Sequence, residues 1–141
     1  MNNHWGTNYR AYQEGPHVFR FLLRPHKGCD PVAASRLAIA ASQPLLPAPP
    51  RGAKPEGKSR LKLSSPDVLV TALKPSDDGK AIIVRLWNAG GRDAQTQVTW
   101  NSPEPRSVWL SNTSEKPLAK VSRAVAVPAW GVVTLRAELA K

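Results

Sequence analysis

The sequence predicts an all-β protein, an antiparallel β-sandwich of about seven or more strands with one short helix and a long proline-rich loop. Three observations predict this fold class. Proline accounts for 14 of the 141 residues, about twice its usual share, and proline interrupts helices. Short runs rich in Val, Ile, Leu, Thr and Trp recur along the second half of the chain. Turn-forming clusters of Gly, Pro, Asp and Asn separate these runs at the spacing of sandwich strands.

Strands are expected where apolar residues lie between turn signals. The first is 17–24, which Pro25 ends, and the others follow Pro66. The turn 74–79 contains the hairpin-forming pair Asp78-Gly79, preceded by Asp77, and Asp and Gly favour tight turns. The later strands are expected at 68–73, 81–88, 95–100, 107–110, 121–127 and 132–139. Basic residues that alternate along these strands predict a solvent-facing side of the sheet: they are Arg20, Arg24, Arg123 and Arg136.

One helix is predicted, over residues 31–42. Asp30 is a favoured N-cap residue, and Pro31 suits the first helical position because its ring fixes the backbone there and no donor is lost. The residues that follow are rich in alanine and include Leu37 and Ile39. This short segment is the only part of the chain where helix signals coincide.

Residues 43–66 differ in composition from the rest of the chain. They hold six of the prolines and five basic residues against the single acidic Glu56. Such a composition favours extended loop conformations and cannot bury much apolar surface. We therefore expect a long basic loop within a single domain over 1–141, since a domain averages about 150 residues.

The charge balance limits the classes of function. The chain has 20 Lys and Arg against 10 Asp and Glu, a net charge of +10. Salt-sensitive binding to nucleic acid in vitro would follow from this charge, yet no helix-turn-helix, OB-type or RNA-recognition signature accompanies it. No apolar run reaches the roughly 18 residues of a membrane helix, and no signal peptide is visible. The single Cys29 rules out an internal disulfide framework, which slightly favours a cytoplasmic location.

No catalytic residue or metal ligand emerges from the motifs. His17, His26, Cys29 and Asp30 match no zinc-site spacing, so they are interpreted as loop residues around a helix start. Nucleophile-elbow, P-loop and dinucleotide-binding motifs are absent. Adjacent carboxylates in a turn point apart, whereas a retaining glycosidase needs two about 5 Å apart. Asp77 and Asp78 are therefore interpreted as turn-forming residues.

The tryptophans divide into two groups. Four lie in or beside expected strands, where packing is the default interpretation: Trp87, Trp100, Trp109 and Trp130. Trp5 instead lies in a polar aromatic stretch with Asn8, Tyr9, Gln13 and Glu14. Amide groups and aromatic rings suit both a sugar and an interface with another domain, and we favour the interface.

Several motifs together resemble a known family. Residues 70–80 (VTALKPSDDGK) and 83–88 (IVRLWN) are similar to the C-terminal β-sandwich region of glycoside hydrolase family 38, the α-mannosidases. Residues 110–118 and 127–136 (VPAWGVVTLR) continue in the order that the family shows. The opening stretch 2–21 resembles the start of the same region. The resemblance thus covers nearly the whole chain except 43–66.

The resemblance implies a retaining α-mannosidase whose separate N-terminal catalytic domain carries the zinc ligands, the aspartate nucleophile and the acid/base carboxylate. None of these can be placed on this chain, so the chain alone is expected not to be an enzyme and to bind no cofactor. Its implied partners are the catalytic and middle domains of the parent enzyme and, as a further option, mannose-containing glycans. Since Met1 falls where the family is in mid-polypeptide, we expect a domain fragment or a truncated reading frame.

Two alternatives remain open at this stage. The first is a stand-alone carbohydrate-binding module that uses the aromatic and amide side chains around Trp5. The second is a basic nucleic-acid-associated protein, for which the net charge of +10 is the argument.

Overall fold

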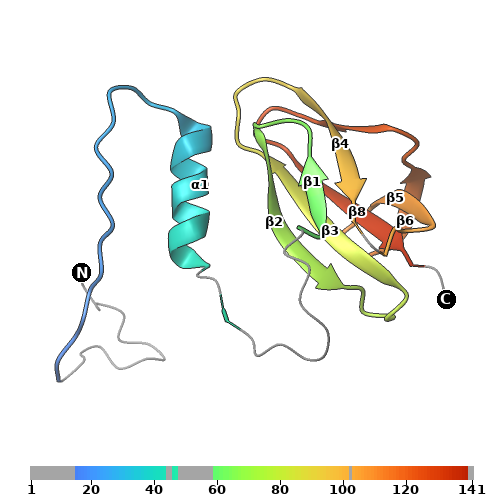
Figure 1. Ribbon diagram of the computed structural model, residues 1–141, viewed down its shortest axis with the longest axis horizontal. Helices are drawn as coiled ribbons and strands as arrows, with labels where there is room; N and C mark the ends of the chain where they lie inside the picture. Colours follow the sequence, from blue (N-terminus) through green and yellow to red (C-terminus); the bar gives the residue numbers. More distant parts are fainter. Residues whose placement is uncertain (1–14, 44–45, 48–58, 102, 140–141) are drawn as a thin grey trace, which may run out of the picture.

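The structure is a computed structural model that describes residues 15–43, 46–47, 59–101 and 103–139 (Figure 1). Two antiparallel sheets dominate these residues, one of three strands in the order β1-β4-β7 and one of five in the order β2-β3-β8-β5-β6. The strands are β1 Leu61–Leu63, β2 Val68–Pro75, β3 Ala81–Asn88, β4 Ala94–Trp100, β5 Ser107–Ser111, β6 Pro117–Lys120, β7 Ala124–Val127 and β8 Val132–Glu138. Within the described ranges, the predicted all-β sandwich with a single helix is confirmed.

The core lies between the two sheets. Val84, Leu86 and Leu135 of the five-stranded sheet and Val127 of the three-stranded sheet are fully buried. Successive side chains of a strand point to opposite faces, so every second residue of β3 and β8 enters this core. β3 lies between β2 and β8 and pairs with both over its whole length. It is therefore the central element of the sandwich.

The predicted helix is confirmed as α1, Pro31–Ser42. The side chain of Asp30 accepts a hydrogen bond from the backbone N–H of Ala33 at 3.0 Å, as an N-cap should. No residue of α1 is buried, and Figure 1 shows it beside the sandwich. Arg36 Nη2 links α1 to the sandwich by donating to the carbonyl of Pro66 at 2.6 Å. No helix in the described part of the chain is long and apolar enough to cross a membrane.

The prediction of a strand at 17–24 is wrong. The structure describes these residues as irregular, and Figure 1 draws them as an extended stretch without a strand arrow. The apolar composition is that of a strand, but a strand also needs a neighbour to hydrogen-bond with. In the part of the chain that the structure describes, no strand pairs with residues 18–24.

Three other boundaries differ from the prediction. The expected loop 43–66 is interrupted by β1, whose Leu61 is buried in the core, while 44–45 and 48–58 lie outside the described residues. The sequence missed β6, a four-residue edge strand that begins at Pro117, where proline is tolerated because one side of an edge strand is unpaired. The strand expected at 121–127 is shorter and covers only β7.

Candidate functional site

The residues proposed for sugar or domain contact lie outside the described part of the chain. They are Trp5, Asn8, Tyr9, Gln13 and Glu14. Their role as a carbohydrate or interface site stays a prediction.

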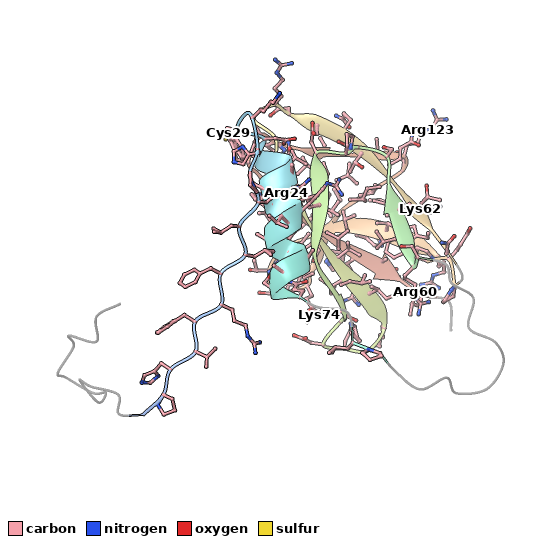
Figure 2. All side chains as sticks on the ribbon, turned by 60° about the vertical axis from the view of Figure 1, so that its left-hand side comes forward. Arg24, Cys29, Arg60, Lys62, Lys74 and Arg123 are labelled. Atoms are coloured by element: carbon pink, nitrogen blue, oxygen red, sulfur yellow. The ribbon has the colours of Figure 1, made fainter. Side chains whose placement is uncertain are left out.

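The loop before α1 holds the cluster that most resembles a metal site in the sequence. Nδ1 of His26 donates to the carbonyl of Gly28 at 2.5 Å, and the Asp30 carboxylate caps the helix. Cys29 is exposed (Figure 2). Within the described ranges no three His, Cys, Asp or Glu side chains gather closely enough to hold a metal ion. His26 shapes this loop, and Asp30 shapes the start of the helix.

A polar network instead surrounds the β2–β3 turn, where Asp78 is its most constrained carboxylate. Asp78 Oδ1 accepts from Ser76 Oγ at 2.6 Å and from the backbone N–H of Lys80 at 3.0 Å. Its Oδ2 accepts from Arg136 Nη2 at 2.6 Å. The Ser76 bond first, then the Lys80 bond and the Arg136 bond, hold the pKa of Asp78 well below its usual range. Asp78 therefore shapes its turn, as predicted, and also binds the neighbouring sheet face.

Glu115 joins the same network from the β5–β6 loop. Its backbone is left-handed, with φ 62°, and the residue is buried. One carboxylate oxygen accepts from Lys74 Nζ at 2.5 Å, and the other accepts from the backbone N–H of Asp77 at 2.7 Å. Hydrogen bonds to Asp77 and then to Glu115 raise the pKa of Lys74. The β5–β6 loop is thereby fastened to the β2–β3 turn.

The prediction that Arg136 faces solvent is wrong. Arg136 retains only 7% of its surface, because the Glu115 loop and the β2–β3 turn close over it. Register places it beside Ile83 of β3 and Trp109 of β5, on the face of the five-stranded sheet opposite the core. Its Nε finds no hydrogen-bond partner among the described residues. This buried guanidinium serves the fold, since the Asp78 carboxylate and the Glu115 carbonyl already accept its hydrogen bonds.

The tryptophans of the sandwich pack as expected, with one partial exception. Trp87, Trp100 and Trp109 are half-buried in their strands, and Trp100 packs against the core. Trp130 is 54% exposed, with φ 58°. Its indole lies over Gly91, where an added Cβ would approach the ring at 3.5 Å. Trp130 therefore packs on one side only.

A groove lies between α1 and the extended stretch before it. Its volume is about 510 Å³, and Figure 2 shows Arg24 beside the helix. Alanines form most of the helix wall: the lining includes Ala33, Ala34, Ala38 and Ala41 with Leu22 opposite. Five large side chains of this stretch are more than half exposed: Val18, Phe19, Phe21, Leu22 and Leu23. The apolar character of this stretch is evident from the sequence, but the strand predicted there does not form.

Comparison with known families decides the identity of the sandwich. A family model described as the glycosyl hydrolases family 38 C-terminal beta sandwich domain matches residues 67–138, just over half of the chain. The chain belongs to this family. The match begins one residue before β2 and ends with β8, so it contains every strand from β2 to β8. No curated protein and no solved structure matches the chain.

The family 38 assignment identifies the sandwich as a non-catalytic domain of a glycoside hydrolase family. The matched description is that of a C-terminal sandwich, and no catalytic domain is matched. Association with other domains of such a hydrolase follows from a domain of this kind. The resemblance noted for residues 2–42 lies outside the match and stays a prediction, as does a single domain over 1–141.

Proposed function

We propose that this chain is the non-catalytic C-terminal β-sandwich of an α-mannosidase-like glycoside hydrolase, and that it packs on and supports a catalytic domain. The family match over 67–138 carries the proposal, because it coincides with the folded sandwich and describes a C-terminal domain. The catalytic and middle domains are the proposed partners, and mannose-containing glycans are proposed as ligands of the assembled enzyme.

The chemistry of the described residues favours a domain that supports a separate catalytic domain. A catalytic zinc ion needs three protein ligands, and the described residues gather no such group, so they do not fit the zinc that the family implies. The acidic residues of the sandwich network are occupied: Asp78 binds Arg136, and Glu115 binds Lys74. We therefore assign zinc and both catalytic carboxylates to the catalytic domain.

The exposed apolar surface supports a partner. Monomeric proteins seldom display contiguous apolar side chains without an interaction to cover them. Phe21 and Leu23 are 83% and 87% exposed in the stretch before α1. This stretch and α1 contribute no buried residue to the sandwich. A second domain that covered them would explain why they are apolar.

The test is direct. The chain should give no hydrolysis of an aryl α-mannoside with added zinc, and it should bind the catalytic half of a family 38 α-mannosidase in sedimentation velocity experiments. Zinc-dependent turnover by the chain alone would contradict the proposal. A saturable change in tryptophan fluorescence with mannobiose would instead favour a stand-alone carbohydrate-binding module.

A further inference from the structure

The extended stretch 18–24 has the sequence of a strand and lacks the pairing of one. No backbone hydrogen bond joins its residues to any other part of the chain that the structure describes. Unpaired backbone N–H and C=O groups beside apolar side chains form the kind of edge that adds to another sheet. The missing element is therefore a β-strand, because only a strand supplies both the backbone partners and the apolar cover.

The two faces of this stretch differ. In an extended backbone, alternate side chains share a face, so Phe19, Phe21 and Leu23 form one wholly apolar face. Leu22 and Arg24 belong to the other face and line the groove against α1. That groove, of about 510 Å³, is open enough to receive side chains from a neighbouring strand.

The two sheets of the sandwich are not positioned to provide a strand that pairs with 18–24. Both views show α1 between the stretch and the two sheets (Figures 1 and 2). Arg36 of α1 is hydrogen-bonded to Pro66 at the start of the sandwich, which links the helix to that side. A strand that paired with 18–24 in this arrangement would come from outside the residues that the structure describes.

The positive charge of the chain indicates which kind of partner would bind 18–24. Residues 15–43 carry four basic side chains against one acidic side chain, Asp30; the basic ones are Arg20, Arg24, Lys27 and Arg36. The whole chain has a net charge of +10, so two copies would repel each other, and complementary charge favours an acidic surface. A second copy of this chain is thus a less favourable partner for 18–24 than an acidic surface.

We propose that residues 18–24 add as an edge strand to an acidic-flanked sheet edge in the catalytic part of the glycoside hydrolase. The proposal rests on the proposed function, and it names the surface through which the sandwich is held. Phe19, Phe21 and Leu23 pack on the partner, while the partner's side chains enter the groove beside α1.

The test uses the whole chain with the catalytic half of a family 38 α-mannosidase as the probe. Amide hydrogen exchange at 18–24 should be fast in the chain alone and about tenfold or more slower in the complex. Phe21→Pro removes an N–H and disfavours pairing, and it should weaken binding by about tenfold or more. Phe21→Ile keeps the apolar and strand-forming character and should stay within about threefold of the unchanged chain. All three chains should unfold at the same temperature, since 18–24 contacts neither sheet.

The outcomes separate the two proposals. If the chain binds but Phe21→Pro binds equally well, or the 18–24 amides stay fast, the strand pairing is overturned while the supporting role stands. If the chain alone dimerises with these amides protected, a second copy is the occupant and the proposal is overturned. If the chain does not bind the probe, both proposals fail together.

Discussion

Replacing Asn88 by alanine should be among the most damaging single changes in the sandwich. Asn88 ends β3 in the five-stranded sheet and is fully buried. Its amide donates to the carbonyl of Arg92 at 2.7 Å and to that of Val127 in β7 at 3.1 Å, and its oxygen accepts from the N–H of Gly90 at 2.9 Å. One side chain therefore ties the five-stranded sheet to the three-stranded sheet and to the loop between β3 and β4.

The cost follows from these three bonds. A buried hydrogen bond contributes about 1 kcal/mol net, and a buried group left unpaired costs about 1–3 kcal/mol. Asn88→Ala should therefore lower the free energy of unfolding by about 3 kcal/mol, which corresponds to a fall in Tm of roughly 12–20 °C for a domain of this size. Asn88→Asp should be worse, because a carboxylate would face the carbonyls of Arg92 and Val127 without a donor to offer them.

Urea unfolding followed by tryptophan fluorescence measures this effect. Gln97→Ala is the matched control, since Gln97 is an exposed amide in β4, and it should change the free energy of unfolding by less than about 0.5 kcal/mol. If Asn88→Ala costs no more than Gln97→Ala, or Asn88→Asp is the milder change, the account of this cross-sheet link is refuted.

Three further changes test other parts of the structure. Because the pKa of Asp78 is depressed on folding, its contribution is present above the ordinary carboxyl pKa of about 4 and is lost as pH falls below it; Asp78→Asn should flatten this part of the stability profile in urea titrations at pH 2.5–6, and parallel profiles would contradict it. Gly131→Ala would place a Cβ 2.9 Å from the carbonyl of Pro128 and should lower the Tm measurably, whereas Gly91→Ala meets only ordinary contacts and should lower it less; equal shifts would count against the packing described. Leu86→Ala empties a fully buried position in β3 and should cost about 2–5 kcal/mol in urea unfolding; a cost below about 1 kcal/mol would mean that the core lies elsewhere.

Local signals explain what the sequence could predict. The helix follows from Asp30 and Pro31, whose cap and first-turn roles depend only on their neighbours. The strands β2 and β3 follow from apolar runs on either side of the turn at 76–79, which contains Gly79 at φ 70°. The family resemblance at 70–80 and 83–88 rests on the same local stretch, and the match over 67–138 confirms it.

Long-range contacts explain what the sequence could not predict. β1 has three residues and is a strand because it pairs with β4 and buries Leu61. Arg136 is hidden because Glu115, 21 positions earlier, folds over it, and no local pattern records that contact. Residues 18–24 have the composition of a strand, but no strand among the described residues pairs with them, so composition alone led to a wrong prediction.

The same limits apply to the candidate site. The exposed Phe21 and the groove beside α1 become visible only when the helix and the preceding stretch are placed together. The sequence drew attention to Trp5 and its neighbours instead, and those residues lie outside the described part of the chain.

The central claim is that this sandwich supports a catalytic domain of a family 38 glycoside hydrolase. The most direct measurement is the inactivation half-life of that catalytic half at a fixed elevated temperature, with and without an excess of the 141-residue chain. A partner that binds only the folded state stabilises it by mass action, so the account predicts a half-life that rises with the concentration of the chain and then saturates. A half-life that the chain leaves unchanged would contradict the claim.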